Sequence, residues 1–192
     1  NTLNGDTIAV YAASLIENIN IWKKLAIITD KNTTVNALNP VNPVFIIRST
    51  ASGSTIQGFN IIGGLNGVKL ENTSNCTLTL NNITGNSFAG VYLYESLNNT
   101  IINNLFTNNS YGIFSEYGDN NTINDNQINN NPNAGLALQY WSDSNHIQGN
   151  NIHDNGYGMH LLYSSNNTIE NNEISNNDFY GMYLDNSQYN SV

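Results

Sequence analysis

The chain is poor in charged residues, and above all in basic ones. Only 10% of its 192 residues are charged. The chain has five lysines and arginines against fourteen aspartates and glutamates, which gives a formal net charge of −9. All five basic residues lie at or before Lys69, and the positions after it carry eleven acids. A surface that binds phosphates must be basic. The composition therefore excludes nucleic acid as an expected partner.

Cysteine and long apolar runs are also scarce. Cys76 is the only cysteine, so no disulfide can form within the chain, and we expect a buried structural thiol rather than a nucleophile. No apolar run approaches the ~18 residues of a membrane-spanning helix. We therefore expect no membrane span in this segment.

What the chain has in abundance is a repeat rich in asparagine. One apolar position follows an Asn/Thr pair and recurs with gaps of 22 to 24 residues, at Ile56, Leu78, Ile101, Ile123, Ile147, Ile169 and Val192. A second apolar residue follows five positions later in the first six copies, and each of these then has a glycine before a short strand pattern. Similarity held at a period of 20–50 residues is typical of a solenoid.

The apolar stretches in each repeat are short and alternate with period two, which indicates strands rather than helices. The sequence therefore predicts an all-β fold, a right-handed parallel β-helix of about eight coils of 22–24 residues with three short strands per coil. Residues 1–47 are expected to form less regular N-terminal coils, and residues 48–192 the regular repeats. Ser191 and Val192 begin a further repeat without a cap, so we expect a longer chain or an end covered by another subunit.

Asparagines recur at two fixed offsets from the first apolar position. Three residues after it stand Asn81, Asn104, Asn126, Asn150 and Asn172, and eight residues after it stand Asn86, Asn109, Asn131, Asn155 and Asn177. Asparagine tolerates the left-handed backbone of a tight corner, and stacked amides can hydrogen-bond along a column. We therefore expect both sets to form structural ladders at corners of the coils.

Three early segments and the repeat units carry a family resemblance. Residues 5–11 (GDTIAVY), 17–21 (ENINI) and 24–28 (KLAII), with the later Ser-x-Asn-Asn-Thr-Ile and Gly-Ile/Met-x-Leu units, resemble NosD-like parallel β-helix proteins. The asparagine-rich, lysine-poor version most resembles the adhesin-like surface proteins of methanogenic archaea. The resemblance implies a cell-surface, extracellular location. It does not fix an activity, because this architecture includes lyases, hydrolases, epimerases and surface proteins without chemistry.

The strand after each glycine presents a candidate ligand-binding face. Its outward position and the following corner are rich in aromatic residues, with acids at the edge. Aromatic rings offer an apolar face to a sugar, and tyrosine hydroxyls, amides and carboxylates can bond its hydroxyls. Cross-strand aromatic contacts can equally serve only to stabilise the sheet. The candidate residues for a glycan or protein ligand are Tyr92, Tyr94, Phe114, Tyr117, Tyr140, Trp141, His160, Tyr163, Tyr183, Glu95 and Glu116.

Asn-x-Ser/Thr sequons are frequent, partly because the repeat itself contains Asn-Asn-Thr. In a secreted protein they are possible sites of N-glycosylation. They begin at Asn32, Asn72, Asn75, Asn82, Asn98, Asn108, Asn120 and Asn166.

No sequence motif of catalysis is present, and we expect no enzymatic activity. Glu116 could pair with Asp119 or with Glu95 for glycoside hydrolysis, but the nearly constant repeat length predicts no long loops to build a shielded cleft. Action on uronates would need cations, and the chain has none after Lys69.

No metal or cofactor is expected. His146, His153 and His160 fall within one coil, but their spacing of seven residues assigns them to different strands. We interpret them as substitutions at core and surface positions of the repeat.

The sequence thus predicts an extracellular structural or adhesive module that presents a repetitive face to glycans or other surface proteins. Two alternatives stay open. One is a filament or surface-layer subunit whose copies stack end to end through open coil ends. The other is a carbohydrate-active enzyme of the glycoside hydrolase kind.

Overall fold

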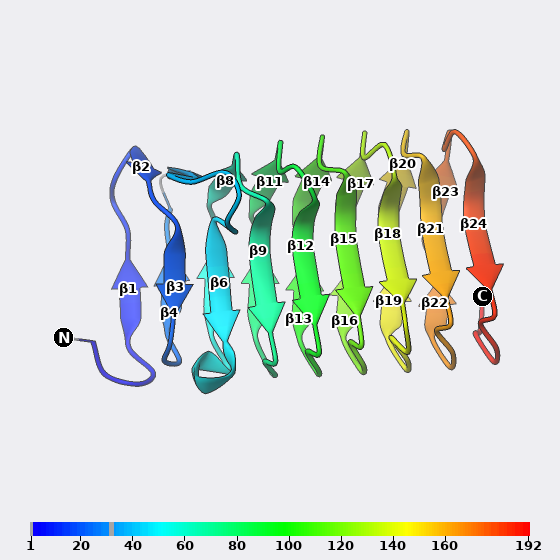
Figure 1. Ribbon diagram of the computed structural model, residues 1–192, viewed down its shortest axis with the longest axis horizontal. Helices are drawn as coiled ribbons and strands as arrows, with labels where there is room; N and C mark the ends of the chain where they lie inside the picture. Colours follow the sequence, from blue (N-terminus) through cyan, green and yellow to red (C-terminus); the bar gives the residue numbers. More distant parts are fainter. Residues whose placement is uncertain (1, 31–32) are drawn as a thin grey trace.

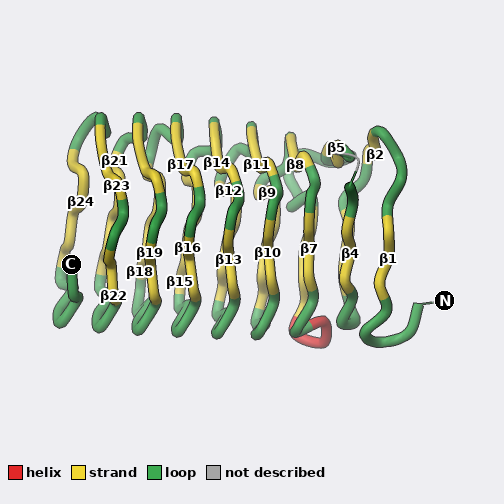
Figure 2. Tube along the Cα trace, turned by 180° about the vertical axis from the view of Figure 1, so that it is seen from behind, coloured by secondary structure: helices red, strands yellow, loops and turns green. Residues whose placement is uncertain are grey.

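The computed structural model describes residues 2–30 and 33–192 and shows a parallel β-helix. Its coils stack along one axis, with the two termini at opposite ends (Figure 1). The same regular stack is seen from behind in Figure 2, where the strands alternate with short corners. The predicted fold class is confirmed. No helix in the described residues is long and apolar enough to cross a membrane.

Each coil contributes one strand to each of three eight-stranded parallel sheets, named A, B and C here. Sheet A contains β1 (Thr7–Ala9), β4 (Ala26–Ile28), β7 (Thr55–Gln57), β10 (Thr77–Thr79), β13 (Thr100–Ile102), β16 (Thr122–Asn124), β19 (His146–Gln148) and β22 (Thr168–Glu170). Sheet B contains β2 (Ser14–Ile16), β5 (Thr34–Asn36), β8 (Asn60–Ile62), β11 (Asn82–Thr84), β14 (Leu105–Thr107), β17 (Gln127–Asn129), β20 (Asn151–His153) and β23 (Glu173–Ser175). Sheet C contains β3 (Ile19–Ile21), β6 (Phe45–Arg48), β9 (Asn66–Glu71), β12 (Ala89–Tyr94), β15 (Tyr111–Glu116), β18 (Ala134–Gln139), β21 (Tyr157–Leu162) and β24 (Tyr180–Asp185). A single 3₁₀ turn, η1 (Ser49–Ala51), follows β6.

The core is a thin column of aliphatic side chains, because alternate residues of each strand point inward. In sheet A, Ile56, Leu78 and Ile101 occupy one register position in successive coils, and all three are fully buried. The core is continuous from the first coil to the last. Each strand is too short to be stable alone, so burial against the coils above and below supplies its stability.

The repeat glycine is the second residue of each sheet C strand from β9 onward, and it allows successive backbones to approach closely. A Cβ atom built on Gly112 would lie 2.5 Å from the carbonyl oxygen of Gly135 and 2.6 Å from Cγ2 of Ile128. Real Cβ atoms do not approach so closely, so the coils would have to move apart. The glycine of the repeat is therefore a packing requirement.

Replacing Gly112 with alanine should lower the free energy of unfolding by about 1–3 kcal/mol, the usual range for overpacking. The matched control is Gly181→Ala in the last coil, where the new Cβ would lie 3.5 Å from Ile174, an ordinary contact. Denaturant unfolding followed by circular dichroism measures both variants. Equal loss of stability in the two would contradict this explanation.

The asparagines at the two predicted offsets stand in two continuous columns. In the first column, the backbone N–H and Nδ2 of Asn81 donate to Oδ1 of Asn104 at 3.0 and 3.1 Å, and Asn104 makes the same two bonds to Asn126. The second column repeats the arrangement from Asn86 and Asn109 onward. Each inner rung thus satisfies a buried backbone group that the corner leaves without a sheet partner.

The backbone role assigned to these asparagines is corrected by the structure. None of the ladder residues has a positive φ; the left-handed residue is the one before the rung, as at Asn103 (φ 57°) and Asp125 (φ 54°). The rung must direct its amide into the column, whereas the preceding residue reverses the chain. Corner and ladder are therefore separate positions in the repeat.

A third column was not recognised in the sequence. Its rungs are Asn99, Asn121, Asn145, Asn167 and Asn190, linked by the same amide bonds. Cys76 begins it, since its backbone N–H donates to Oδ1 of Asn99 at 2.9 Å. The signal was present, because each of the first four rungs stands two residues before an isoleucine of the repeat.

Candidate functional site

The outer face of sheet C brings the aromatic and charged candidates into one register. Lys69, Tyr92, Phe114, Ala137, His160 and Tyr183 occupy the same outward position in six successive coils. Parallel pairing spaces them by about 4.8 Å. The face is not uniform, and it divides into a buried aromatic cluster, a charged cluster, an exposed corner and a second aromatic cluster.

The buried aromatic cluster lies over β12 and β15. Phe114, expected to face a ligand, is only 7% exposed, because Phe88 and Tyr111 pack against it with ring centroids 5.1 and 5.0 Å away. Tyr92 completes the cluster and is half-buried. Phe114 therefore stabilises the sheet and is not an accessible ligand contact.

A charged cluster lies beside it, across β6, β9, β12 and β15. Glu71 forms ion pairs with Arg48 and with Lys69, the latter at 2.6 Å. The hydroxyl of Tyr92 donates to Oε2 of Glu116 at 2.6 Å. Arg48 and Lys69 were not recognised as site residues from the sequence.

Two groups of the charged cluster have shifted pKa values. Burial lowers the pKa of Lys69, and the charge of Arg48 adds to this effect. Burial also raises the pKa of Tyr92, and its hydrogen bond to Glu116 acts in the same direction. At neutral pH Tyr92 is therefore a protonated donor.

The exposed corner after sheet C carries four aromatic residues, named the corner strip here: Tyr117, Tyr140, Trp141 and Tyr163. Their exposed fractions are 37%, 37%, 62% and 46%. The ring of Tyr117 stacks nearly parallel to those of Tyr140 and Trp141, with centroids 6.3 and 5.9 Å apart. Tyr94 meets Tyr117 edge-on at 6.2 Å. These rings offer a broad apolar surface to solvent.

All four residues of the corner strip have a left-handed backbone, with φ between 48° and 62°. The same corner is formed by Asn72 (φ 54°) and Asn186 (φ 49°) in other coils, and by Glu95 (φ 49°) in the coil of β12. A left-handed conformation is unusual for a bulky residue, and it occurs far more readily at asparagine. Asparagine would therefore adopt the backbone of this corner at a lower energetic cost than tyrosine.

A second aromatic cluster covers the last two strands of sheet C. Tyr157 lies 5.2 Å from His160 and from Phe179, and His160 lies 5.4 Å from Tyr183. Burial lowers the pKa of His160, an effect that the nearby Asp185 partly opposes. Tyr157 and Phe179 were not among the predicted ligand residues, although Tyr157 directly precedes a repeat glycine.

The three histidines lie on three different sheets, on β19, β20 and β21. His146 contacts Gln148 at 3.2 Å, and His153 contacts Asp154 at 2.7 Å. Within residues 2–30 and 33–192, no three His, Cys, Asp or Glu side chains are grouped as metal ligands.

Most of the sequons lie at exposed corners. Asn75, Asn98, Asn120 and Asn166 occupy one corner before sheet A, and all four have a left-handed backbone. The corners also carry Asn72 and Asn108, whereas Asn82 lies half-buried in β11 and Asn32 lies outside the described residues.

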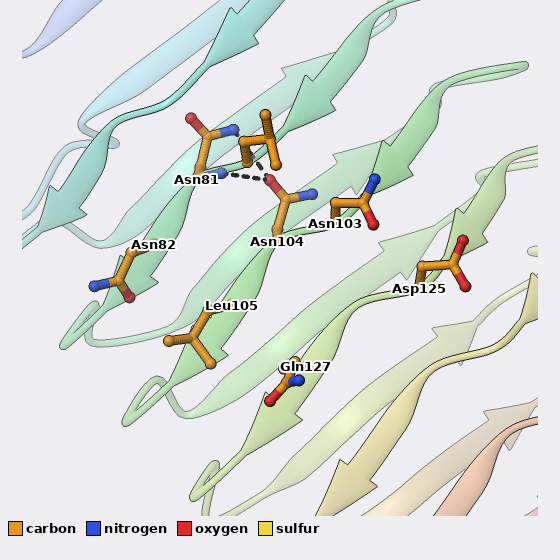
Figure 3. Close-up of a pocket in the computed structure, with 8 residues that line it drawn as sticks. Asn81, Asn82, Asn103, Asn104, Leu105, Asp125 and Gln127 are labelled. Carbon is orange, nitrogen blue, oxygen red and sulfur yellow. Dashed lines mark hydrogen bonds between the residues drawn. The ribbon is translucent and has the colours of Figure 1, made fainter. Parts of the chain in front are cut away.

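A shallow groove of about 390 Å³ lies where sheet A passes into sheet B (Figure 3). Asn81 and Asn104 line it, and their amides are already bonded in the first ladder. Asn82, Asn103 and Asp125 are among the other lining residues, which include no aromatic side chain. The groove therefore offers a ligand fewer free groups than the outer face of sheet C.

Several solved structures share the fold. One is the mannuronan C-5 epimerase AlgE6 A-module of Azotobacter vinelandii, with a TM-score of 0.65 and 16% sequence identity. The match covers 98% of this chain and 55% of the epimerase module. An alginate lyase of a Paenibacillus species matches over 98% of this chain and 94% of the lyase, with a TM-score of 0.59 and 10% identity. The enzymatically active domain of tailspike protein 2 of bacteriophage CBA120 matches 97% of this chain over 37% of its own chain, with a TM-score of 0.64 and 14% identity. At these identities the likeness shows the fold alone.

The expectation that the chain has no enzymatic activity is corrected by these structures. An epimerase and a lyase share this fold. The absence of a familiar motif and of long loops was therefore no ground for excluding catalysis. The structure also places Arg48 and Lys69 on the aromatic face, so cations are not missing from it.

One relative is known by sequence as a cell surface glycoprotein of Methanothermus fervidus. It is 34% identical over 94 residues, which are 49% of this chain and 15% of the relative. The chain thus matches a small part of that protein. The predicted resemblance to surface proteins of methanogenic archaea is confirmed by this match.

The family model described as "Right handed beta helix region" matches residues 44–192, more than three quarters of the chain. The match begins just before β6 and extends through the last coil, so it includes every strand of the candidate face from β6 onward. This chain belongs to the right-handed β-helix family.

Proposed function

We propose that the chain is a module of a cell-surface protein that binds glycans along its corner strip. The name of the Methanothermus relative supports the location. The exposed, stacked rings of Tyr117, Tyr140 and Trp141 support the ligand, because such rings pack against the apolar face of a sugar.

The backbone of the corner strip is the observation that carries this proposal. Tyrosine or tryptophan in a left-handed conformation costs roughly 1 kcal/mol or more. Asn72 and Asn186 show that the same corner closes with asparagine. Residues held in sparsely populated conformations are concentrated at functional sites. A role in stability alone does not explain why three successive coils retain aromatic rings there.

The arrangement of the corner strip suits an extended ligand. Its residues lie in three successive coils, which are about 4.8 Å apart along the axis of the helix. Each contact would be weak, and several contacts to one chain would add to a useful affinity. No lysine or arginine follows Lys69, and the chain after it carries eleven acids. The charge therefore favours neutral glycans over polyuronates.

A glycan array tests this proposal with the protein and a Tyr117→Ala/Trp141→Ala variant. We expect the protein to bind a set of neutral oligosaccharides and the variant to lose that set. Equal signals from both proteins would remove the corner strip as the site, and no signal from either would remove glycan binding.

A second candidate is the modification of polysaccharides at the charged cluster. Glu71 and Glu116 occupy one register position two coils apart, or about 10 Å along the axis. Inverting glycosidases hold two carboxyl groups about 6.5–9.5 Å apart. Tyr92, whose pKa is raised by burial, stays protonated and donates a hydrogen bond to Glu116.

This second candidate predicts new reducing ends when the protein is incubated with its polysaccharide, measured on a panel of neutral and acidic polymers. Glu116→Gln should abolish their formation, while Trp22→Ala, which removes a ring at the far side of Arg48, should not. A panel without products from the unaltered protein would contradict the candidate.

A further inference from the structure

The corner between sheet C and sheet A contains two left-handed residues, three positions apart. In the coil of β15 they are Tyr117 of the corner strip and Asn120, and in the coil of β21 they are Tyr163 and Asn166. Three residues of extended chain span at most about 11 Å. These corners lie along one edge of the solenoid (Figure 1). The corner strip therefore has a second row of corner residues beside it, and in several coils that row begins a sequon.

This second row is named the sequon column here. Its members are exposed asparagines that begin a sequon, namely Asn75, Asn98, Asn120 and Asn166. The amide of Asn75 donates to the hydroxyl of Ser74 at 3.1 Å. In the described part of the chain, the side chains of the other three form no hydrogen bond, and neither do the threonines that end their sequons, Thr100, Thr122 and Thr168. Both groups that define an acceptor site are thus unengaged at these three corners.

The other described sequons lack this combination. Asn82 lies half-buried in β11, and its Oδ1 is buried. The sequon of Asn108 ends at Ser110, whose hydroxyl accepts from Nδ2 of Asn133 at 2.6 Å. The sequon of Asn72 ends at the hydroxyl that is bonded to Asn75. The fold therefore distinguishes acceptor sites that the sequence pattern treats as equal.

The corner before sheet B separates the sequon from the needs of the fold. Both corners contain a left-handed residue, a buried asparagine of a ladder and the first residue of a strand, as in residues 120–122 and 125–127. In five successive coils, no sequon begins at the left-handed residues before sheet B, which are Leu80, Asn103, Asp125, Gly149 and Asn171. Before sheet A, four of the corresponding five corners carry one. Backbone geometry alone thus does not explain the sequon column.

The fifth corner before sheet A interrupts the sequon column. Ser144 and His146 stand where Asn120 and Thr122 stand one coil earlier, and the left-handed backbone is kept at Ser144, with φ of 57°. This coil carries Trp141, the most exposed ring of the corner strip. The column is therefore interrupted at the coil where the strip is most exposed.

We infer that Asn98, Asn120 and Asn166 carry N-linked glycans, and that the gap in the sequon column keeps the Trp141 coil of the corner strip clear of them. An oligosaccharyltransferase joins the anomeric carbon of a sugar to Nδ2 of the asparagine, which loses one proton, while the bond from that carbon to the phosphate of a lipid-linked donor breaks. The modification requires only the surface location, whereas the role of the gap rests on the proposed function. A glycan is bulky, so each one would border the corner strip on the side of sheet A.

The first test measures acceptor activity. The folded protein is incubated with an archaeal oligosaccharyltransferase and a polyprenyl diphosphate-linked oligosaccharide, and the occupancy of each site is read by mass spectrometry. We expect glycans at Asn166 and at Asn98 or Asn120, which lie one coil apart, or about 4.8 Å. Occupancy at Asn82 should be at least about tenfold lower, because reaching it requires local opening of β11.

The matched control for acceptor activity is a synthetic peptide of residues 79–86, in which the Asn82 sequon is unfolded and should be modified. Modification of this peptide without any at the sequon column of the folded protein would overturn the inference. Equal occupancy at Asn82 and at the column in the folded protein would also overturn it, because the fold would then not select the sites.

The second test closes the gap. Ser144→Asn/His146→Thr completes the sequon column in the coil of Trp141, and the corner accommodates both residues, since Asn120 and Thr122 hold the same positions one coil earlier. Before glycosylation, the variant should bind a neutral oligosaccharide from the array as tightly as the unaltered protein. After glycosylation its affinity should fall by about tenfold or more, whereas the unaltered protein glycosylated in the same way should keep its affinity. Titration calorimetry measures all four samples.

The two tests fail separately. Unchanged affinity of the glycosylated variant would overturn the role of the gap and leave the modification standing. A protein that binds no oligosaccharide in any form would overturn the proposed function and the role of the gap with it, while mass spectrometry still decides the modification.

Discussion

Replacing Asn126 with alanine should lower the free energy of unfolding by about 3–5 kcal/mol. Oδ1 of Asn126 accepts from the backbone N–H and Nδ2 of Asn104 at 3.0 and 3.1 Å. Its Nδ2 donates to the carbonyl of Ile101 at 2.9 Å and to Asn150 at 3.0 Å. All these bonds are buried, and each group left without a partner costs about 1–3 kcal/mol.

Urea unfolding followed by circular dichroism measures this loss. The matched control is the next residue, Gln127→Ala, because Gln127 is exposed on the outer face of β17 and belongs to no ladder. Exposed substitutions of this kind usually change stability by less than about 0.5 kcal/mol. Similar midpoints for Asn126→Ala and the control would show that the ladder adds little to stability.

Removal of the indole of Trp141 should weaken glycan binding by roughly tenfold or more. Trp141 is 62% exposed and stacks on Tyr117 at 5.9 Å. Tryptophan and tyrosine carry a large share of the binding energy at interfaces, and a factor of ten corresponds to about 1.4 kcal/mol. The double variant Trp141→Ala/Tyr117→Ala should lose more glycan affinity than either single variant. Its loss should be smaller than the product of the two single fold-losses, because the two rings contact each other.

Titration calorimetry measures the affinity of the variants that lack Trp141, and fluorescence adds a check on the strip, because the chain contains two tryptophans. Trp22→Ala leaves Trp141 as the only source of tryptophan fluorescence, so its titration reports on the corner strip directly. Trp22 lies against Arg48 at the other end of the face, and its removal should leave the affinity unchanged. A larger loss of affinity for Trp22→Ala than for Trp141→Ala would place the ligand elsewhere.

The fold could be predicted from the sequence because the same pattern of apolar residues recurs in successive coils. The apolar positions fix which residues point inward, and the constant gaps fix the register between coils. Hence Lys69, Tyr92 and His160 lie in one outward row, as their positions in the repeat require. The columns of asparagine follow from the same regularity, and the third column was overlooked although its offset is equally constant.

The surface of sheet C could not be predicted in the same way. Phe114 is hidden because Phe88, which lies before the strand β12, folds over it, and a repeat pattern does not say where such a ring goes. Lys69 lies on the same strand as Glu71 and Arg48 on the strand before it, and the repeat pattern does not state which long side chains form ion pairs. Ala137 interrupts the aromatic row between Phe114 and His160.

Ala134 and Ala137 are only 1% and 0% exposed, because the rings of the neighbouring coils pack over them. By contrast, tyrosine at a corner where Asn72 and Asn186 stand in other coils is informative, because the repeat does not need it.

The structure of the protein in complex with a neutral oligosaccharide selected from the array tests the central claim most directly. We predict sugar rings packed against Tyr117 and Trp141. An oligosaccharide bound to the outer face of sheet B or only at the charged cluster, with the corner strip bare, would contradict it.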